Sequence, residues 1–315
     1  MYKNVVLLAQ IVFTSSAFGM SASCETLQYK SMSRGKEVTL QAELCLPDGG
    51  RAPFRTIILQ HSSGPELKLS VTNGRTDEAA KAVGDLALRK NFAVIYTDSF
   101  TPRGIGRSNK FGTDLIGSDE IARDISRLVR RLRDDARIDQ NKLFLYGQSQ
   151  GGGAAIKSSY VHQWESANFL KGKETPFAAV FASAPGCHVQ FDSAIGQPLK
   201  IMTGEKDDWA PVTSCISLRE LQRRRGISHI EVEVVPGTIH TWSTDGGQWN
   251  SDVKSYRNCQ DKIVIIKSDG SMFRNGKQIR KDEVQDCLSR GATSRGNRAK
   301  LPFLAEKVLT YFEQF

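Results

Sequence analysis

The sequence predicts an α/β fold with a mainly parallel central sheet, helices on both faces of that sheet and an antiparallel edge at its N-terminal end. Short apolar runs, typical of buried strands, alternate with helical stretches through most of the 315 residues. Near the N-terminus, apolar and polar residues alternate as in a half-exposed hairpin. The apolar fraction of 39% and the charged fraction of 24% exclude disordered and fibrous proteins.

The first 23 residues have the layout of a secretory signal peptide. Lys3 precedes an uncharged run, residues 4–23, whose middle is apolar and whose end is rich in small residues. We therefore expect residues 1–23 to be removed on export to the periplasm or the medium, and residues 24–315 to form one domain with no stable membrane insertion. An uncleaved membrane anchor is the alternative, which the short apolar part disfavours because a spanning helix needs about 20 apolar residues.

All six cysteines lie beyond this leader, and an even number in an exported protein predicts disulfides. Sequence does not fix the connectivity, but neighbours along the chain are the simplest pairs. These pairs are Cys24 with Cys45, Cys187 with Cys215, and Cys259 with Cys287. The spacings are unlike those of a zinc site, so we expect no metal. Cys24 follows small residues, as a lipid-modified cysteine does, yet no aliphatic residue stands three places before it.

The formal net charge is +9, which is typical of proteins that bind anionic substrates or surfaces and also of a basic solubilising face. No motif of a nucleic-acid-binding protein is present, so no nucleic-acid partner is expected.

The N-terminal half predicts strands and two helices in turn. The strands are expected at residues 26–30, 37–46, 56–60 and 92–97. A first helix is expected at about residues 76–90. A second helix follows Ser118, a good N-cap with Asp119 and Glu120 in the first turn. Its apolar face comprises Ile121, Ile125, Leu128, Val129 and Leu132.

In the C-terminal half the alternation continues and then weakens past His240. Strands are expected at residues 178–182, 199–203 and 230–235, and helices at residues 213–225 and 301–315. Residues 248–300 are interpreted as an insertion on the main domain, clipped by Cys259 and Cys287. Within it, residues 262–273 are typical of a small hairpin.

Residues 146–153 contain Gly-x-Ser-x-Gly directly after the apolar residues 143–145. In a nucleophile elbow a strand ends, the chain turns sharply and a helix begins, with the nucleophile at the tip. Gly147 and Gly151 fit such a turn because a side chain at either position would collide with its neighbours. Ser149 is therefore the candidate nucleophile, and an ordinary glycine-rich loop is the alternative.

A serine hydroxyl needs a base, and the base needs an acid that orients it. Among five histidines, His240 is the best base because it follows the last core strand in a loop that can reach over the sheet. The acid is expected after the preceding strand, where Asp207 and Asp208 both stand. Serine, acid, histidine is the chain order of α/β-hydrolases.

These motifs resemble the dienelactone hydrolase-like branch of the α/β-hydrolases. The resemblance extends from about Cys45 to Trp242 and rests on residues 61–64, 147–152, 204–208 and 240–242. It implies the α/β-hydrolase fold and, from the family's Gly-x-x-Asp motif, Asp207 as the acid. The namesake enzymes carry a cysteine where this chain has Ser149, so the chain is more similar to the esterase and peptidase members.

The resemblance also implies an oxyanion hole made of two backbone N–H groups. One belongs to Gln150, and the other lies in the loop after an early strand. In relatives that loop begins His-Gly. Here Ser62 replaces the glycine, so Ser63 is the expected donor and Ser62 the reserve, while His61 is expected to be structural.

Three further residues are candidates for substrate contacts. Arg103 lies in a loop after a strand and could hold a carboxylate or phosphate, or form an ordinary salt bridge. Trp209 and Trp242 adjoin the proposed acid and base and are equally compatible with a pocket wall and with core packing.

Together these features predict an exported serine hydrolase that cleaves a small-molecule or polymeric ester through an acyl-enzyme, without an organic cofactor. A peptidase or amidase with the same three residues is the first alternative. A non-catalytic binding protein on a hydrolase scaffold is the second.

Overall fold

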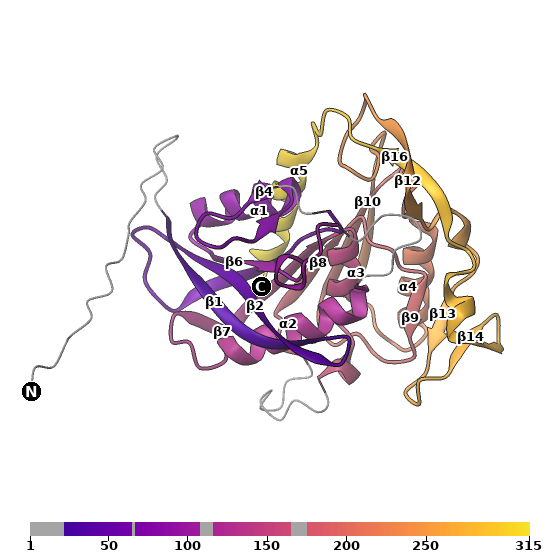
Figure 1. Cartoon of the computed structure of the whole chain (residues 1–315), viewed down its shortest axis with the longest axis horizontal. Coiled ribbons are helices and arrows are strands. Elements are labelled where there is room, and N and C mark those ends of the chain that lie inside the picture. Colours follow the sequence, from indigo (N-terminus) through magenta and orange to yellow (C-terminus); the bar gives the residue numbers. More distant parts are fainter. Residues whose placement is uncertain (1–21, 65–66, 108–115, 165–174) are drawn as a thin grey trace, which may run out of the picture.

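An eight-stranded, mostly parallel sheet forms the centre of the molecule (Figure 1). The structure is a computed structural model that describes residues 22–64, 67–107, 116–164 and 175–315. The strand order is β1-β2-β6-β3-β7-β8-β10-β11. Their bounds are β1 Ala22–Ser33, β2 Lys36–Pro47, β3 Phe54–Gln60, β6 Ala93–Asp98, β7 Ile138–Gln148, β8 Ala179–Ser183, β10 Leu199–Gly204 and β11 Ile230–Val235. Only the β1–β2 and β2–β6 pairs of this sheet are antiparallel, which confirms the predicted α/β class and its antiparallel edge.

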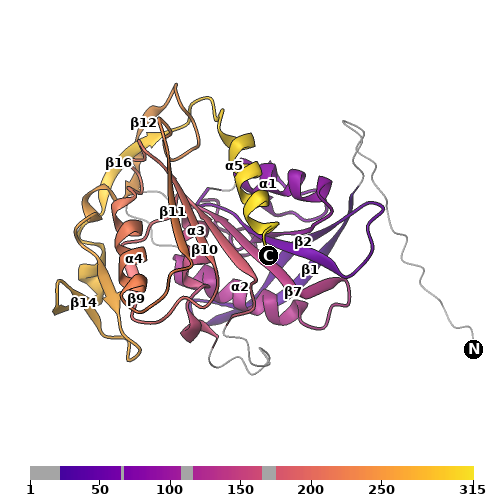
Figure 2. The ribbon, with the colours of Figure 1, turned by 180° about the vertical axis from the view of Figure 1, so that it is seen from behind.

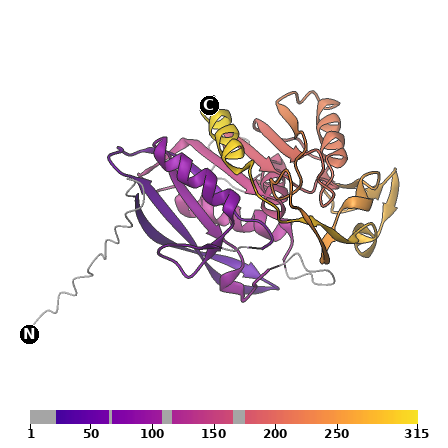
Figure 3. The same ribbon diagram turned by 90° about the horizontal axis from the view of Figure 1, so that it is seen from above.

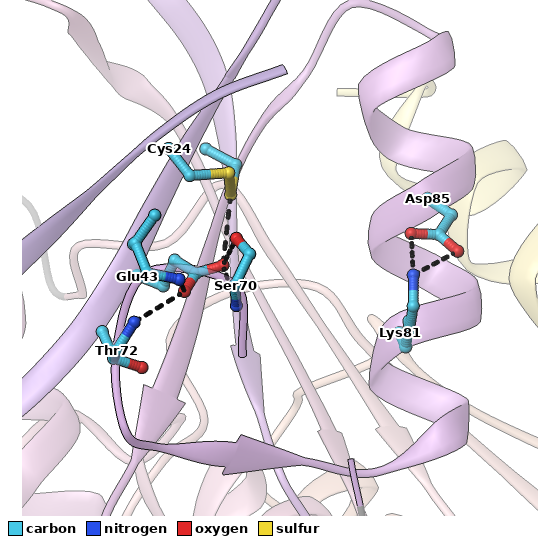
Figure 4. The surroundings of a disulfide bond; sticks show 8 residues. Cys24, Glu43, Ser70, Thr72, Lys81 and Asp85 are labelled. Atoms are coloured by element: carbon cyan, nitrogen blue, oxygen red, sulfur yellow. Dashed lines mark hydrogen bonds and ion pairs between the residues drawn. A yellow bond between two sulfur atoms is a disulfide. The ribbon is translucent and has the colours of Figure 1, made fainter. Parts of the chain in front are cut away.

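The edge hairpin β1–β2 turns at Arg34 and Gly35, whose φ values of 48° and 79° explain the glycine. Cys24 lies directly opposite Cys45 in this hairpin, and the two form a disulfide. Beside the disulfide, the buried Glu43 carboxylate accepts hydrogen bonds from the backbone N–H groups of Ser70 and Thr72 (Figure 4). The disulfide joins the two strands of the hairpin, and the carboxylate ties this edge of the sheet to the segment that follows β4 (Leu67–Lys68).

In the described part of the chain, five helices cover the two faces of the sheet (Figures 1 and 2). Residues of α1 (Glu78–Arg89) and α5 (Leu301–Phe312) share one apolar core, in which Phe312 stacks on Phe144 of β7 at 4.8 Å. The other face carries α2 (Ser118–Leu132), α3 (Gln150–Lys157) and α4 (Thr213–Arg223). All predicted apolar residues of α2 are buried.

The start of α2 differs from its prediction. Gly117, and not Ser118, is the N-cap of α2. The Ser118 hydroxyl instead donates to the carbonyl of Gln150 at 3.0 Å. The backbone N–H of Gly117 is bound by the Glu120 carboxylate at 3.1 Å, so the first turn is satisfied from within the helix. This places the start of α2 against the start of α3.

The insertion contributes strands to two small sheets beside α4 (Figure 3, orange). One pairs β12 (Gln248–Ser255) with β16 (Ser289–Ser294). The other has the order β15-β14-β13-β9, and its strands are β9 Val189–Phe191, β13 Val264–Ile266, β14 Met272–Arg274 and β15 Lys277–Ile279. The expected hairpin is confirmed as β13–β14. Short helical turns complete the chain: η1 Thr101–Arg103, η2 Val161–Gln163, η4 Arg257–Cys259 and η5 Lys281–Gln285.

The remaining two disulfides are the predicted ones, Cys187–Cys215 and Cys259–Cys287. Most of the expected leader, residues 1–21, lies outside the described residues, while Ala22 and Ser23 already belong to β1. Within the ranges described, none of the helices has the length and apolarity needed to cross a membrane.

Candidate active site

Ser149 occupies the sharp turn between β7 and α3. Its φ of 53° and ψ of −112° are rarely adopted by a residue with a side chain, so the turn is strained. Two backbone hydrogen bonds hold it: the Ser149 N–H donates to the Ser183 carbonyl at 2.8 Å, and the Gly153 N–H donates to the Ser149 carbonyl at 2.9 Å. The strand, turn and helix expected of a nucleophile elbow are therefore present.

The glycines of the motif have no room for side chains. A Cβ on Gly147 would lie 2.2 Å from the carbonyl oxygen of Gly151, and one on Gly151 would lie 2.4 Å from the carbonyl oxygen of His61. Both contacts are to backbone, which cannot move aside cheaply. The steric reason given for these glycines from the sequence is confirmed.

The structure brings Ser149, His240 and Asp207 together in one chain of hydrogen bonds. The His240 Nε2 atom lies 2.8 Å from Ser149 Oγ, and Nδ1 lies 2.7 Å from Asp207 Oδ2. An ionised carboxylate can only accept hydrogen bonds. The Nδ1 atom therefore carries the proton and donates a hydrogen bond to Asp207. The lone pair of Nε2 then faces Ser149 Oγ and can take up its proton.

Backbone donors fix the carboxylate of Asp207. Its Oδ1 atom accepts from the N–H groups of Trp209 at 2.9 Å and Ala210 at 2.8 Å, which leaves Oδ2 for the histidine. Asp208 faces the insertion, where its two oxygens accept from the N–H and the hydroxyl of Thr293. The geometry therefore separates the two aspartates that the sequence left open.

The candidate oxyanion donors differ in what they already bind. The Ser62 N–H donates to Asp77 Oδ2 at 2.6 Å, so it is occupied. The N–H of Ser63 has no hydrogen-bond partner within the described part of the chain, and Ser63 lines the cavities at Ser149. Burial raises the pKa of Asp77, whereas the hydrogen bonds from the N–H groups of Ala80 and Ser62 lower it by a smaller amount. Gln150 follows the nucleophile as the first residue of α3.

His61 is engaged by its own turn. The Ser99 N–H donates to His61 Nε2 at 3.1 Å, so Nδ1 carries the proton and donates to the Ser62 carbonyl at 2.6 Å. The ring is completely buried against Phe100. It shapes the loop that carries Ser62 and Ser63, which agrees with the structural role expected from the sequence.

The two tryptophans have different places. Trp209 packs its ring on the imidazole of His240, with ring centroids 4.8 Å apart, and lines both cavities. Its Nε1–H donates to the Lys254 carbonyl of β12 at 2.7 Å, so the insertion holds this ring. Trp242 is only 1% exposed, although it reaches the edge of one cavity.

Sequence reasoning missed a buried polar network around Trp242. The Trp242 Nε1–H lies 3.0 Å from both Gln148 Oε1 and Ser183 Oγ, and the Gln148 amide donates to the His240 carbonyl at 3.4 Å. The hydroxyl of Ser183 donates to Gln148. These contacts join the histidine loop to the elbow. Gln148, inside the Gly-x-Ser-x-Gly motif, and Trp242, beside the proposed base, gave sequence signals, whereas Ser183 gave none.

The assignment of Arg103 as a substrate contact is corrected. Its side chain is 2% exposed and forms a buried ion pair with Asp124 of α2, with nitrogen and oxygen 2.8 Å apart. The guanidinium also donates to the carbonyls of Ser99 and Met32. Arg103 lines neither cavity at Ser149, so it joins the N-terminal hairpin to α2 and not the protein to a ligand.

One group of side chains in the described ranges has donor atoms close enough to share a metal ion, namely Cys24, Glu43 and Cys45. The two sulfur atoms are joined to each other and offer no thiolate. This group therefore does not have the chemistry of a metal site.

Two cavities meet at Ser149, with volumes of about 510 and 670 Å³. Both are lined by Ser63, Ser149, Trp209 and His240. Cavities of this size hold ligands of many atoms. The arrangement can activate a hydroxyl beside space for a substrate.

No protein-family model matches the sequence. No curated protein matches it either.

Solved structures match the fold at low sequence identity. Esterase 2 of Thermogutta terrifontis, phosphoramylated by tabun, aligns with 92% of this chain and 94% of its own, with a TM-score of 0.55 and 11% identity. A protein named as a dienelactone hydrolase, from Klebsiella pneumoniae subsp. pneumoniae, aligns over 93% and 100%, with a TM-score of 0.50 and 11% identity. A protein named as a dipeptidyl aminopeptidase IV, from Bacteroides ovatus, aligns over 94% of this chain and 36% of its own, with a TM-score of 0.54 and 13% identity. These likenesses concern the fold.

Proposed function

We propose that this chain, which has the α/β-hydrolase fold, is an exported serine hydrolase that cleaves carboxylic esters. The observation that carries the proposal is the position of His240 between Ser149 Oγ, at 2.8 Å, and Asp207 Oδ2, at 2.7 Å. The fold alone would not support a reaction, because unrelated functions share it. The strained turn at Ser149 and the space beside it add to the case.

In the proposed mechanism Ser149 Oγ attacks the ester carbonyl carbon while His240 Nε2 takes the hydroxyl proton. The carbonyl oxygen becomes negative and is stabilised by the backbone N–H groups of Gln150 and Ser63. His240 then gives its proton to the leaving alkoxide, which departs as the alcohol. Water repeats the sequence on the acyl-enzyme, with His240 again as base, and releases the acid and Ser149. Asp207 keeps the ring oriented and stabilises its charged form.

Ester cleavage is the reaction proposed first, and the fold is compatible with it because it matches an esterase over 94% of that protein's length. A peptidase or amidase with the same residues remains the alternative, since the fold also matches a protein named as an aminopeptidase. Three disulfides favour an exported protein. The net charge of +9 favours an anionic ester as substrate.

The first test is hydrolysis of short- and medium-chain nitrophenyl esters, with nitroanilides as the amide counterparts, by the wild type and by Ser149→Ala. We expect the variant to lose at least about a thousandfold in kcat, because the remaining site can only bind and polarise the ester. Ser214→Ala is the matched control: Ser214 is a buried serine on α4 that lines neither cavity, and this variant should keep its activity.

A fluorophosphonate probe gives a second readout that does not depend on choosing the right ester. It should label Ser149 in the wild type and leave Ser149→Ala unlabelled. Wild-type protein that is folded yet unlabelled, and inactive on all esters, would favour the binding-protein alternative. Turnover of nitroanilides ahead of esters would favour the peptidase.

A further inference from the structure

We propose that the substrate is an ester with a multi-atom group on each side of the scissile bond, and that Arg75 and Arg295 bind an anionic substituent on one of these groups. The proposal rests on the hydrolase function proposed above and names its substrate class. It follows from the way in which two cavities meet at the nucleophile and from the unequal charge of their walls.

The position of Ser149 indicates that the substrate extends in two directions from the scissile bond. The cavities of about 510 and 670 Å³ share Ser63, Ser149, Trp209 and His240, so the nucleophile lies where they join. An ester bound for attack has its carbonyl carbon at Ser149 Oγ and extends from there as an acyl part and an alcohol part. Each cavity lies in the range of about 300 to 1,000 Å³ that is typical of ligand sites. An acetyl or methyl ester would leave one of them empty.

The smaller cavity, here called the arginine cavity, is lined by arginine residues from three parts of the chain. Arg75 comes from β5 (Arg75–Thr76), Arg107 from the loop after η1, and Arg295 and Arg298 from the segment between β16 and α5. Such a convergence from distant segments differs from a run of surface charges, which lies along one element.

The carboxylates of the arginine cavity do not neutralise Arg75 and Arg295. Glu78 forms an ion pair with Arg298, and the Asp77 carboxylate accepts from the N–H groups of Ser62 and Ala80. No carboxylate in the described ranges lies within ion-pair distance of the Arg75 or Arg295 side chain. Guanidinium groups bind carboxylate and phosphate through paired N–H donors, so an anion is the ligand that these two residues fit.

The larger cavity, here called the α2 cavity, has walls of mixed charge. Asp119, Glu120 and Arg123 of α2 line it together with Lys254 and Lys281 of the insertion, so acidic and basic residues nearly balance. Asp119 is paired with Lys157 at 2.6 Å, and Glu120 holds the N–H of Gly117. The lining also includes the ring of Tyr256. These walls suit a polar group without a strong charge of its own.

The insertion therefore builds part of both cavities. It supplies Asn250 to the arginine cavity, with Arg295 just beyond β16, and it supplies Lys254 and Lys281 to the α2 cavity. Residues 248–300 thus have a function that the sequence left open: they make the site two-sided. The same segment holds Trp209 against His240, as described above.

The experiment compares esters that match in size and differ in charge. The 4-nitrophenyl esters of glutaric acid and of pentanoic acid place a carboxylate or a methyl group at the end of the acyl part. The butyrates of 4-hydroxy-3-nitrobenzoic acid and of 4-methyl-2-nitrophenol do the same on the alcohol part. We expect the wild type to prefer one of the two anionic esters over its neutral counterpart by at least about tenfold in kcat/KM, with shorter acyl or alcohol parts hydrolysed more slowly.

The double variant Arg75→Gln with Arg295→Gln should lose this preference, so that its ratio of kcat/KM for the charged and neutral esters falls to about one. Arg89→Gln removes an exposed arginine at the end of α1, outside both cavities, and should behave as the wild type. Equal rates on charged and neutral esters in the wild type, or a preference that survives in the double variant, would overturn the inference alone. Failure of the wild type on every ester, together with no fluorophosphonate labelling of Ser149, would instead remove the proposed function on which it rests.

Discussion

At the scale of single residues, the two neighbouring aspartates allow a sharp test of the proposed acid. Asp207→Asn replaces the carboxylate that accepts from His240 Nδ1 by an amide that can donate to it. The imidazole is then favoured in the wrong tautomer, with the proton on Nε2 facing Ser149. We expect kcat to fall by about ten-thousandfold, with KM changing far less.

Asp208→Asn is the matched control. Its amide oxygen can still accept from the N–H of Thr293, and the side chain does not contact His240. Activity within a few-fold of the wild type is expected for this variant. If the two variants lost activity equally, Asp207 would not have the proposed role, and the loop of residues 204–210 would act only as a unit.

Ser149 and His240 could be named from the sequence because the motif and the chain order each constrain their positions. Arg103 could not be placed in this way. Its partner Asp124 lies 21 residues away on the buried side of α2, and nothing local distinguishes a buried ion pair from a ligand contact. Arg75 and Arg295 were missed because they lie far apart in the sequence and line one cavity only once the chain has folded.

At the scale of elements, the strands and helices of the core were predictable because each has its own hydrophobic period. Among the strands that were missed, β9, β12 and β16 have none. Strand β9 has three residues and pairs in parallel with β13, far along the chain. The sequence of β12 is largely polar, and its pairing with β16 shifts register between Asn250 and Lys254. Tertiary contacts, and not local pattern, decide these elements.

His188 provides a pH test of how the insertion is joined to the core. It stands directly before β9, its carbonyl accepts from the Val264 N–H of β13, and its ring lies on Tyr256 with centroids 4.5 Å apart. Burial, aided by the charges of Lys157 and Arg274, lowers the pKa of His188 from 6.5 to about 3.

The folded protein therefore keeps His188 neutral, while the unfolded chain takes up a proton below about pH 6.5. The stability that depends on the neutral ring is complete above that pH and decreases as the pH falls towards 3. At pH 4.5 the loss from this group should reach roughly 3 kcal/mol. His188→Phe retains a ring against Tyr256 and removes the titration. Urea unfolding at pH 7.5 and 4.5 should show a difference in free energy of unfolding that is smaller in the variant by about this amount, whereas identical differences would contradict the burial argument.

At the scale of the whole molecule, the insertion and the core meet at the loops that carry Asp207 and His240. Thr293 holds Asp208, the Arg295 carbonyl accepts from the hydroxyls of Thr241 and Ser243, and β12 holds Trp209. The acid loop and the histidine loop are thus both anchored to one segment, which the Cys259–Cys287 disulfide closes. A change in the insertion should therefore affect both the geometry and the selectivity of the site.

The prediction that concerns the whole chain is its processing. If residues 1–23 form a leader, cleavage must fall at or before Ser23, because removal of Cys24 would leave Cys45 without its partner across the hairpin. Loss of Ala22 and Ser23 would shorten only the first end of β1. Intact mass of protein recovered after export should show the leader removed and Cys24 retained. Reduction should then add two hydrogens for each of the disulfides Cys24–Cys45, Cys187–Cys215 and Cys259–Cys287. The same chain made in a reducing cytosol serves as the control, with its cysteines open to alkylation. A full-length exported product, or free thiols in it before reduction, would show that the chain is not processed and oxidised in this way.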